Sequence, residues 1–268
     1  MPKAKYDLIF IALVYGNTTD VVELIESAER VNCSSKFIIV NSYYDDESMK
    51  QCLNIANKYG CDFLNTGNKG YGSGNNRGIE YALKQYTFDF LVVSNPDTVI
   101  QELDYRYLSS LKSNVIGPMI ITSTGKNQNP FYVRKKIFPS AEYKFLSSRN
   151  KLGYYSIIAI NKLIKHAFFA GMKLRKIHEK KVYAVHGSFV IFSYAALKNL
   201  GTVFDENIFL FCEEMVLAEE MKYKKIEAIY TDRIKIYHKE DGSMKFLDGS
   251  MHDIEVQSNG YVLNKYFS

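Results

Sequence analysis

Short apolar runs alternate with amphipathic stretches over the first 121 residues of the chain. Between the runs, apolar residues recur three or four positions apart, as helices require. Strands that alternate with helices predict an α/β fold, with a Rossmann-like, mixed and mostly parallel sheet covered by helices on both faces. The expected strands are 8–14, 37–40, 62–64 and 88–93, and the expected helices include residues 21–28, a stretch ending near 59, and 79–86.

Strand-length runs resume after residue 181. Strands are expected at 182–192, 226–230 and 234–237, and a helix is expected to contain Glu213 and Glu214. A chain of 268 residues has about the length of one domain with an elaboration. We therefore expect a single domain over 1–268, with a first half at 1–125, an insertion at 134–181, a second half at 182–243 and a tail at 244–268.

Charge is distributed unevenly along the chain. Hydrophobic residues make up 47% and charged residues 24%, which suits a folded protein with a sizeable core. The net charge is +5, yet residues 134–181 carry thirteen Lys and Arg against two acids, which is +11 and leaves −6 on the remainder. The insertion therefore favours an anionic partner or surface.

A helix over residues 154–173 would be amphipathic at about 100° per residue. Basic residues, among them His166, share one side, and apolar or small residues fill the other. This pattern is typical of a helix at a membrane interface, where cations are attracted to anionic lipid. The alternative is that the apolar side packs against the body and the lysines are solvated. The cations assigned to the membrane are Lys162, Lys165, Lys173, Arg175 and Lys176.

Targeting and cysteine patterns point to the inside of the cell. No stretch of about 18 residues lacks charge, so no membrane-spanning helix is expected, and the run at 8–14 is too short for a signal peptide. The four cysteines form no CxxC pair, which favours reduced thiols. The expected location is cytoplasmic and peripheral, on the inner face of the cell membrane.

Four polar, turn-like segments follow the first four predicted strands. They are 15–17, 41–48, 65–78 and 94–97. Because ligands bind beyond the carboxyl ends of the strands in such sheets, these segments are expected to border a binding site. The third is rich in glycine and opens a helix, so its N–H groups can approach a phosphate. It could equally be a tight turn, since Gly72-x-Gly74-x-x-x-Gly78 is one residue off the dinucleotide fingerprint.

Three further positions carry reactive side chains. Asp97 ends a strand in the sequence Ser-Asn-Pro-Asp, where an isolated aspartate is usually a cap. Glu213 and Glu214 follow an aromatic run; in an apolar cleft one of them would have a raised pKa suited to a general base, and otherwise they form a solvated helix face. His238 follows a strand and is either a ligand or a hydrogen-bonded structural residue.

The order of these pieces resembles glycosyltransferase family 2, whose members have the GT-A fold. The resemblance covers residues 6–243 apart from the insertion and is similar in detail to rhamnosyl- and galactofuranosyl-type transferases of bacterial surface polysaccharides. It rests on Asn65-x-Gly67 with Gly70-Tyr-Gly-Ser-Gly-Asn-Asn-Arg-Gly-Ile79, on Ser94-Asn-Pro-Asp97, on Gly187-Ser-Phe-Val-Ile-Phe-Ser193, and on Gly201-Thr-Val-Phe-Asp-Glu-Asn-Ile-Phe-Leu-Phe-Cys-Glu-Glu214.

The resemblance implies an inverting transfer of a sugar from a UDP- or dTDP-linked donor to a hydroxyl group. The acceptor would be a saccharide, expected to be linked to polyprenyl diphosphate, in capsule, O-antigen or cell-wall polysaccharide synthesis. Residues 1–125 would bind the nucleotide sugar, and 182–243 would hold the acceptor and the catalytic groups. The implied donor-binding residues are Tyr15, Asn17, Asn41, Asp45, Asn65, Gly72, Asn75, Asn76 and Asn95.

The resemblance also implies a metal and a base. Mg²⁺ or Mn²⁺ would bind Asp97, and His238, which is matched to the family's His-then-Gly-x-Ser pattern and is followed here by Gly242-Ser243, would complete the site. Glu214 would be the general base, although the choice between it and Glu213 stays open. His186, Gly187 and Ser188 would lie on the acceptor side.

The sequence departs from the family at Asn41, where the family has aspartate; Asp45 is placed to take over part of that role. Two other classes of protein were weighed. A nicotinamide-dependent oxidoreductase would leave the glutamates and His238 unexplained. A non-catalytic basic module that binds nucleic acid is disfavoured by the apolar side of the basic helix. The tail after Ser243 is expected either to mediate a homodimer or to extend the acceptor site.

Overall fold

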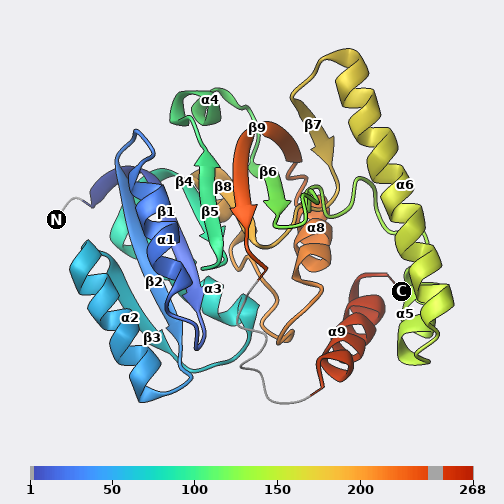
Figure 1. The fold of residues 1–268 in the computed structure, drawn as a ribbon, viewed down its shortest axis with the longest axis horizontal. Coiled ribbons are helices and arrows are strands. Elements are labelled where there is room, and N and C mark those ends of the chain that lie inside the picture. Colours follow the sequence, from blue (N-terminus) through green and yellow to red (C-terminus); the bar gives the residue numbers. More distant parts are fainter. Residues whose placement is uncertain (1–2, 241–249, 268) are drawn as a thin grey trace.

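The structure is a computed structural model that describes residues 3–240 and 250–267. Its centre is one large sheet (Figure 1), and within the described residues the strand order is β3-β2-β1-β4-β8-β6-β9-β5, with β7 paired to β9. The strands are β1 Ala4–Val14, β2 Ser35–Ser42, β3 Asp62–Thr66, β4 Tyr86–Ser94, β5 Thr98–Glu102, β6 Val115–Thr122, β7 Glu179–Val182, β8 Phe189–Ser193 and β9 Ala228–His238.

The sheet is mixed and mostly parallel, as predicted. Of the nine strands in the described part of the chain, β1, β2, β3, β4, β6 and β9 run in one direction. β8 is antiparallel to both β4 and β6, and β5 and β7 are antiparallel to β9. The start of β8 therefore meets the carboxyl end of β4, where Phe189 is in register with Ser94.

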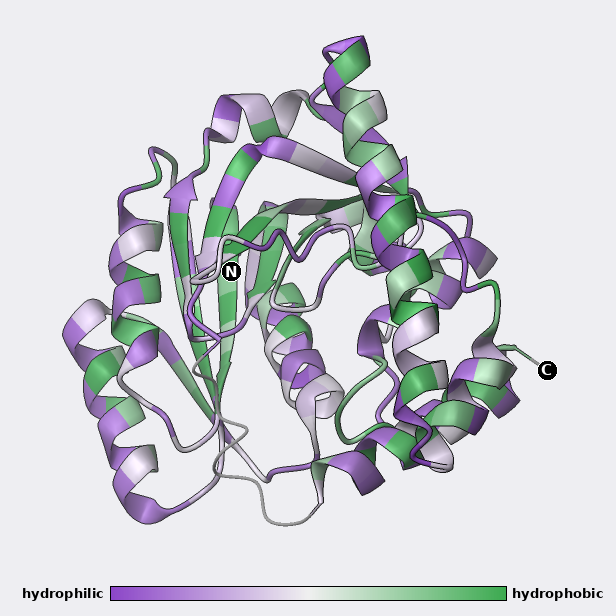
Figure 2. Ribbon diagram, turned by 45° about the vertical axis from the view of Figure 1, so that its right-hand side comes forward, coloured by the Kyte–Doolittle hydropathy of each residue, from purple (hydrophilic) through white to green (hydrophobic). Residues whose placement is uncertain are grey.

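Helices cover both faces of the sheet. They are α1 Asp20–Glu29, α2 Asp46–Tyr59, α3 Tyr71–Gln85, α4 Tyr105–Ser110, α5 Pro139–Ser147, α6 Lys151–Arg175, α7 Tyr194–Leu200, α8 Glu213–Tyr223 and α9 Met251–Tyr266. Because side chains alternate along a strand, Phe10 of β1 packs into a core with α1 and α2, while Ile11 packs into a second core with α3, α7 and α8. The strands are correspondingly apolar in Figure 2.

Several predicted boundaries were wrong. Residue 86 does not belong to the third helix: α3 ends at Gln85 and Tyr86 begins β4 in extended conformation. The run at 182–192 is two strands, β7 and β8, because residues 183–188 leave the sheet to border the site. Residues 226–230 and 234–237 belong mostly to one strand, β9, whose register shifts at the Pro118–Met119 step of β6.

The basic insertion forms α5, α6 and β7, at the side of the sheet next to β9 (Figure 1). The tail helix α9 packs against α5 and α8. Its Tyr261 and Lys265 side chains both bind Asp205 of the body, at 2.7 Å each. Insertion and tail, which are far apart in sequence, therefore lie side by side beyond the central sheet.

Candidate active site

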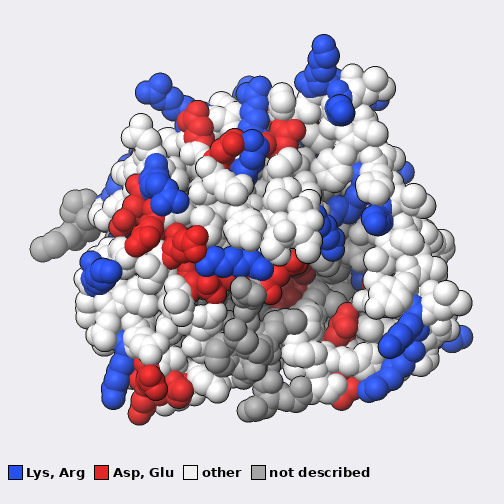
Figure 3. Space-filling view, in the orientation of Figure 1, with Lys and Arg blue, Asp and Glu red and all other residues white. Residues whose placement is uncertain are grey.

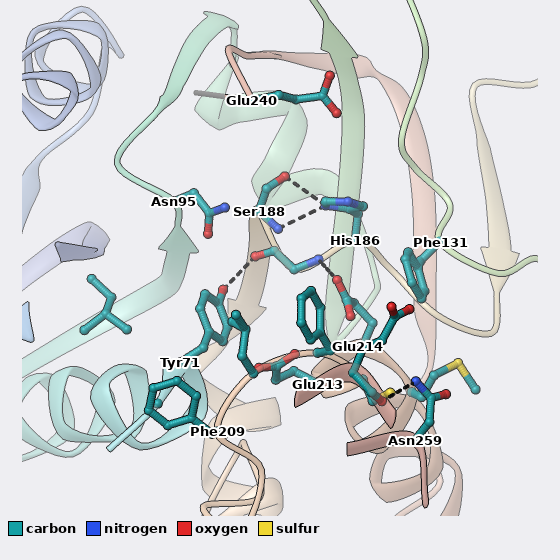
Figure 4. A pocket seen from close by; sticks show the side chains of 18 of the residues that line it. Tyr71, Asn95, Phe131, His186, Ser188, Phe209, Glu213, Glu214, Glu240 and Asn259 are labelled. Carbon is teal, nitrogen blue, oxygen red and sulfur yellow. Dashed lines mark hydrogen bonds between the residues drawn. The ribbon is translucent and has the colours of Figure 1, made fainter. Parts of the chain in front are cut away.

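A cavity of about 610 Å³ opens at the carboxyl edge of the parallel strands. Its lining includes Tyr15 after β1, Asn95 and Asp97 after β4, Ser188 before β8, and His238 at the end of β9. Glu213 and Glu214 enter from α8 (Figure 4). The structure thus brings together the predicted metal, base and acceptor-side positions.

Asp97 and His238 form a buried pair at one end of this cavity. Asp97 is 2% exposed and His238 is 6% exposed. Asp97 Oδ1 and His238 Nε2 lie 3.3 Å apart, and neither atom has a hydrogen-bond partner among the described residues. Strand pairing fixes this approach, since Thr98, at the start of β5, is in register with His238.

Gln128 determines which nitrogen of His238 faces Asp97. Its amide nitrogen donates to Glu240 Oε1 at 2.9 Å, so its amide oxygen must face His238 Nδ1, 2.7 Å away. An oxygen can only accept, so Nδ1 carries the proton. In the neutral imidazole, Nε2 then presents a lone pair to a carboxylate oxygen. Two acceptors aimed at each other in a buried position fit a cation between them.

The two glutamates begin α8 at the other side of the cavity. The two residues before the helix, Phe211 and Cys212, both have left-handed backbone, with φ of 71° and 69°. Such conformations cost about 1–3 kcal/mol each in residues other than glycine and concentrate at functional sites. The turn directs both carboxyl groups inward: Glu213 is 8% exposed, and its Oε1 has no hydrogen-bond partner in the described part of the chain.

Burial raises the pKa of both carboxyl groups. For Glu213, the negative charge of Glu214 adds to burial, and the pKa rises to about 8. For Glu214, burial raises the pKa, while the Gly187 N–H and the charge of Lys136 oppose the rise. Glu214 therefore ionises first and Glu213 keeps its proton near neutral pH.

Gly187 holds Glu214 in place. Its N–H donates to Glu214 Oε1 at 3.1 Å, and its carbonyl accepts from the Tyr71 hydroxyl at 2.8 Å (Figure 4). A Cβ at position 187 would lie 3.1 Å from the same glutamate oxygen, so glycine permits the close approach. Tyr71 was not among the predicted site residues, although it stands inside the glycine-rich motif.

His186 is neutral, and its proton lies on Nε2. Nδ1 accepts from the Ser188 N–H at 3.1 Å, so this nitrogen carries no proton. Burial, followed by the nearby His238, lowers the pKa of His186 to about 3. The backbone N–H of His186 donates to Oδ1 of the buried Asn129 at 2.7 Å. Asn129 thus positions the acceptor-side segment, a role that no motif indicated.

The predicted donor-binding residues divide into two groups. Tyr15 and Asn95 line the cavity. Asn17 instead bonds Asp20 at the start of α1, and Asp45 caps α2 by accepting from Ser48 N–H at 2.8 Å, which lowers its pKa. Asn41 donates to Asn65 Oδ1 at 2.7 Å, with its own oxygen buried and lacking a hydrogen-bond partner among the described residues. Their donor-binding roles stay predictions.

The glycine-rich segment packs against the second half of the chain. Asn76 exchanges two hydrogen bonds with the backbone of Phe204, and a Cβ on Gly72 would lie 2.9 Å from the Phe204 side chain. The Tyr71 N–H, at the start of α3, donates to Phe209 O at 2.9 Å. Asn75 stays in its own helix, bonding Tyr71 O at 3.0 Å. Gly72 and Asn76 therefore join the two halves of the domain.

The basic helix α6 is oriented differently from the prediction. Its inward side takes Phe168 and Met172 from the expected apolar side, but also Lys165 from the expected basic side. Lys165 donates to the backbone oxygens of Asn127 and Gln128, and burial lowers its pKa to about 8. Assigning Lys165 to the membrane was wrong, because these carbonyls lack partners in the sheet and a long cation satisfies them.

The opposite side of α6 exposes leucines. Leu152, Leu163 and Leu174 are 85%, 67% and 85% exposed. They are eleven positions apart, which returns to nearly the same side of a helix at about 100° per residue. Lys162, Lys173, Arg175 and Lys176 are exposed beside them. Figure 3 shows Lys and Arg side chains spaced along this side of the molecule with uncharged surface between them.

Sequence reasoning missed the residues at the far end of the cavity. Tyr154 from α6 donates to Glu255 of α9, Asn259 of α9 lies beside them, and Lys136 pairs with Glu142. The insertion was expected to face a membrane, so it suggested no cavity wall, whereas extension of the acceptor site was one of the two alternatives for the tail. The Gly242 and Ser243 of the predicted His-Gly-x-Ser pattern lie outside the described residues.

Comparison with solved structures identifies the fold. The chain superimposes on GalNAc-T7, solved with UDP, GalNAc and Mn²⁺, with a TM-score of 0.64 over 97% of this chain and 48% of that one, at 10% identity. It matches TarS from S. aureus with a TM-score of 0.55 over 87% of this chain and 36% of that one, at 13% identity. The fold is the GT-A fold.

Sequence comparisons agree with this assignment. No family model matches the chain. It is 29% identical over 130 residues to the hexosyltransferase Agl10 of low-salt glycan biosynthesis in Haloferax volcanii, covering 46% of this chain and 40% of that protein. It is 22% identical over 246 residues to the rhamnosyltransferase WbbL of Escherichia coli K12, covering 86% and 83%. The predicted resemblance to GT-A glycosyltransferases is confirmed, and these matches support glycosyl transfer in glycan biosynthesis.

Proposed function

We propose that the protein is an inverting glycosyltransferase that uses a UDP- or dTDP-linked sugar. The main support is that a single cavity of this GT-A fold contains two buried acids in different surroundings. Asp97 faces a histidine nitrogen at one end, and Glu214, next to a carboxyl group that keeps its proton, stands at the other side. The first arrangement suits a cation and the second suits a base.

Asp97 and His238 would hold Mg²⁺ or Mn²⁺. Their facing acceptor atoms fit a divalent cation, since hard cations favour oxygen ligands and imidazole also binds Mn²⁺. Within the described residues no group of three or more His, Cys, Asp or Glu is arranged to hold a metal. The remaining ligands would come from the donor diphosphate and water. Bound metal supplies Lewis-acid stabilisation of the leaving diphosphate.

Glu214 would act as the general base. Gly187 fixes its Oε1, which leaves Oε2 to accept the proton of an acceptor hydroxyl. As that proton moves to Glu214, the acceptor oxygen bonds to the anomeric carbon, and the bond from that carbon to the diphosphate oxygen breaks. Attack from the face opposite the diphosphate inverts the configuration. Glu213, still protonated near neutral pH, adds no competing negative charge.

The acceptor is proposed to be a saccharide on polyprenyl diphosphate, reached at an anionic membrane surface. In residues 3–240 and 250–267, none of the helices has the length and apolar character needed to cross a membrane. The exposed leucines of α6 and the cations beside them instead complement an interface, where apolar side chains enter and cations meet anionic headgroups.

Vesicle co-sedimentation tests the membrane part. Replacing Leu152, Leu163 and Leu174 by Ser should weaken binding to phosphatidylserine-containing vesicles at least about tenfold, because burying a leucine side chain contributes about 1.5–3 kcal/mol. Tyr223→Ser, at a residue 84% exposed on α8, is the matched control. Equal binding of the triple variant and the control would show that α6 does not dock there.

A donor screen tests the transferase. UDP- and dTDP-sugars, with NAD as a negative control, are incubated with the protein with and without Mn²⁺. Slow release of one nucleoside diphosphate, dependent on the metal, is the expected result. Absence of release from every donor would contradict the proposed function.

A further inference from the structure

The cavity extends past the two glutamates into an end that the sheet does not form. In Figure 4, Glu240 and Asn95 lie at one side of Glu214, and Asn259 lies at the other. The walls on the Asn259 side come from α6 and α9 and from the segment that leads into α5. This end is therefore formed by the insertion and the tail and not by the central sheet.

The wall on the insertion side contains a buried ion pair. Lys136 Nζ lies 3.1 Å from Glu142 Oε1, and the two side chains are only 10% and 9% exposed. Lys136 also lies over the ring of Tyr132, 5.5 Å from its centroid. Because Glu142 already neutralises this lysine, it is not a free cation for a phosphate or carboxylate ligand.

A hydrogen bond between α6 and α9 joins the wall on the tail side to the insertion. The Tyr154 hydroxyl of α6 donates to Glu255 Oε1 of α9 at 3.0 Å, and Asn259 Nδ2 donates to the Glu255 carbonyl at 2.9 Å. The bond positions a carboxylate, with a second oxygen left to accept, at the edge of the cavity.

Acidic groups outnumber basic ones at this end. Among the described residues that line it, Lys136 is the one cation, and the same lining contains the carboxyl groups of Glu142, Glu214 and Glu255 as well as the protonated Glu213. An anionic ligand would meet like charges at short range in a poorly solvated space, which is strongly unfavourable. A neutral sugar would find aromatic surface at Tyr132 and acceptor oxygens for its hydroxyls.

We infer that this end is the acceptor subsite and that it selects an uncharged sugar over a uronic acid or phosphorylated one. The inference rests on the proposed function and adds that the acceptor sugar is uncharged. The diphosphate of a lipid-linked acceptor must then lie outside the cavity, toward the exposed cations of α6. Tyr154 and Glu255 are the specificity-determining pair.

Saturation-transfer NMR on the full chain tests it without turnover. The probes are the methyl glycosides of glucose, galactose and mannose, each with its uronic acid counterpart. At least one neutral glycoside should bind, and its uronic counterpart should bind at least tenfold more weakly. Glu255→Gln, which removes one negative charge, should reduce the difference in affinity between the neutral and the uronic glycoside. Tyr154→Phe should weaken binding of the neutral glycoside.

Two neighbouring positions supply matched control substitutions for Tyr154→Phe and Glu255→Gln. Tyr155→Phe changes an adjacent tyrosine that is 62% exposed, and Asp253→Asn changes an acid of α9 whose side chain is 71% exposed. Both should behave as the unaltered protein. Equal binding of neutral and uronic probes, no binding of any neutral probe, or identical behaviour of Tyr154→Phe and Tyr155→Phe would overturn the inference. Nucleotide release in the donor screen is measured separately, so failure of the proposed function is recognised independently.

Discussion

The Asp97 end and the Glu214 side of the cavity both present a carboxyl group, but the neighbour of that group differs: a histidine nitrogen beside Asp97 and a second carboxyl group beside Glu214. Asp97 faces a nitrogen of His238, whose other nitrogen is hydrogen-bonded to Gln128, and this pair is the proposed cation site. Glu214 is buried beside a second carboxyl group, and burial together with the charge of Glu214 makes Glu213 keep its proton near neutral pH. The partner of each carboxylate, and not the carboxylate itself, decides between binding a metal and accepting a proton.

The largest effect is expected at Asp97. Asp97→Asn keeps the shape but removes the charge that a divalent cation requires. Because Lewis-acid assistance contributes several kcal/mol, the Mn²⁺-stimulated rate should fall by about 10³-fold or more. Nucleotide-release assays over a Mn²⁺ titration measure it. Stimulation that persists at the original midpoint would remove Asp97 from the metal site.

A comparable but metal-independent loss is expected at Glu214. Glu214→Gln cannot accept the acceptor proton, and transfer should drop by about 10²–10⁴-fold. Donor binding, followed by a thermal shift with the nucleotide sugar, should survive. If Glu213→Gln shows the larger loss instead, the roles of the two glutamates are exchanged.

A smaller effect on metal affinity is expected at Gln128, which hydrogen-bonds His238. Gln128→Leu removes the acceptor that fixes His238 Nδ1–H, and such orienting partners typically contribute about 10–100-fold in metal affinity. The Mn²⁺ midpoint should rise by that factor, with the rate at saturating metal largely kept. An unchanged midpoint would mean that His238 is not a ligand through Nε2.

The smallest effect is expected in the stability of the folded protein and comes from Glu213, the neighbour of the proposed general base. The raised pKa of Glu213 means that the folded protein keeps a proton that the unfolded chain loses above its ordinary pKa, so stability falls as pH rises from about 4.5 toward 8. Glu213→Gln removes this penalty. Its Tm advantage should be absent near pH 4 and grow toward pH 8, by about 2–4 °C per kcal/mol. A constant difference across that range would contradict the raised pKa.

The sequence predicted the central fold because its signals are local. The continuous apolar run at residues 8–14 and the helical spacing at 21–28 follow from which side chains face the two cores, and both elements formed where expected. Gln85 and Tyr86 could not be separated from the pattern alone, since an apolar residue at a helical position also suits the start of a buried strand.

The sequence by itself determined the site's main groups, Asp97, His238, Glu213 and Glu214, since each stands in a short motif at the end or start of an element. Only the tertiary structure decided their chemistry. The pairing of Asp97 with His238 depends on the register of β5 and β9, and the different protonation of the glutamates depends on burial and on Gly187. The inward turn of Lys165, and the cavity wall shared by α6 and α9, depend on carbonyls and side chains far away in the chain. Such contacts leave no periodic trace in a sequence, because they are made between elements and not within them.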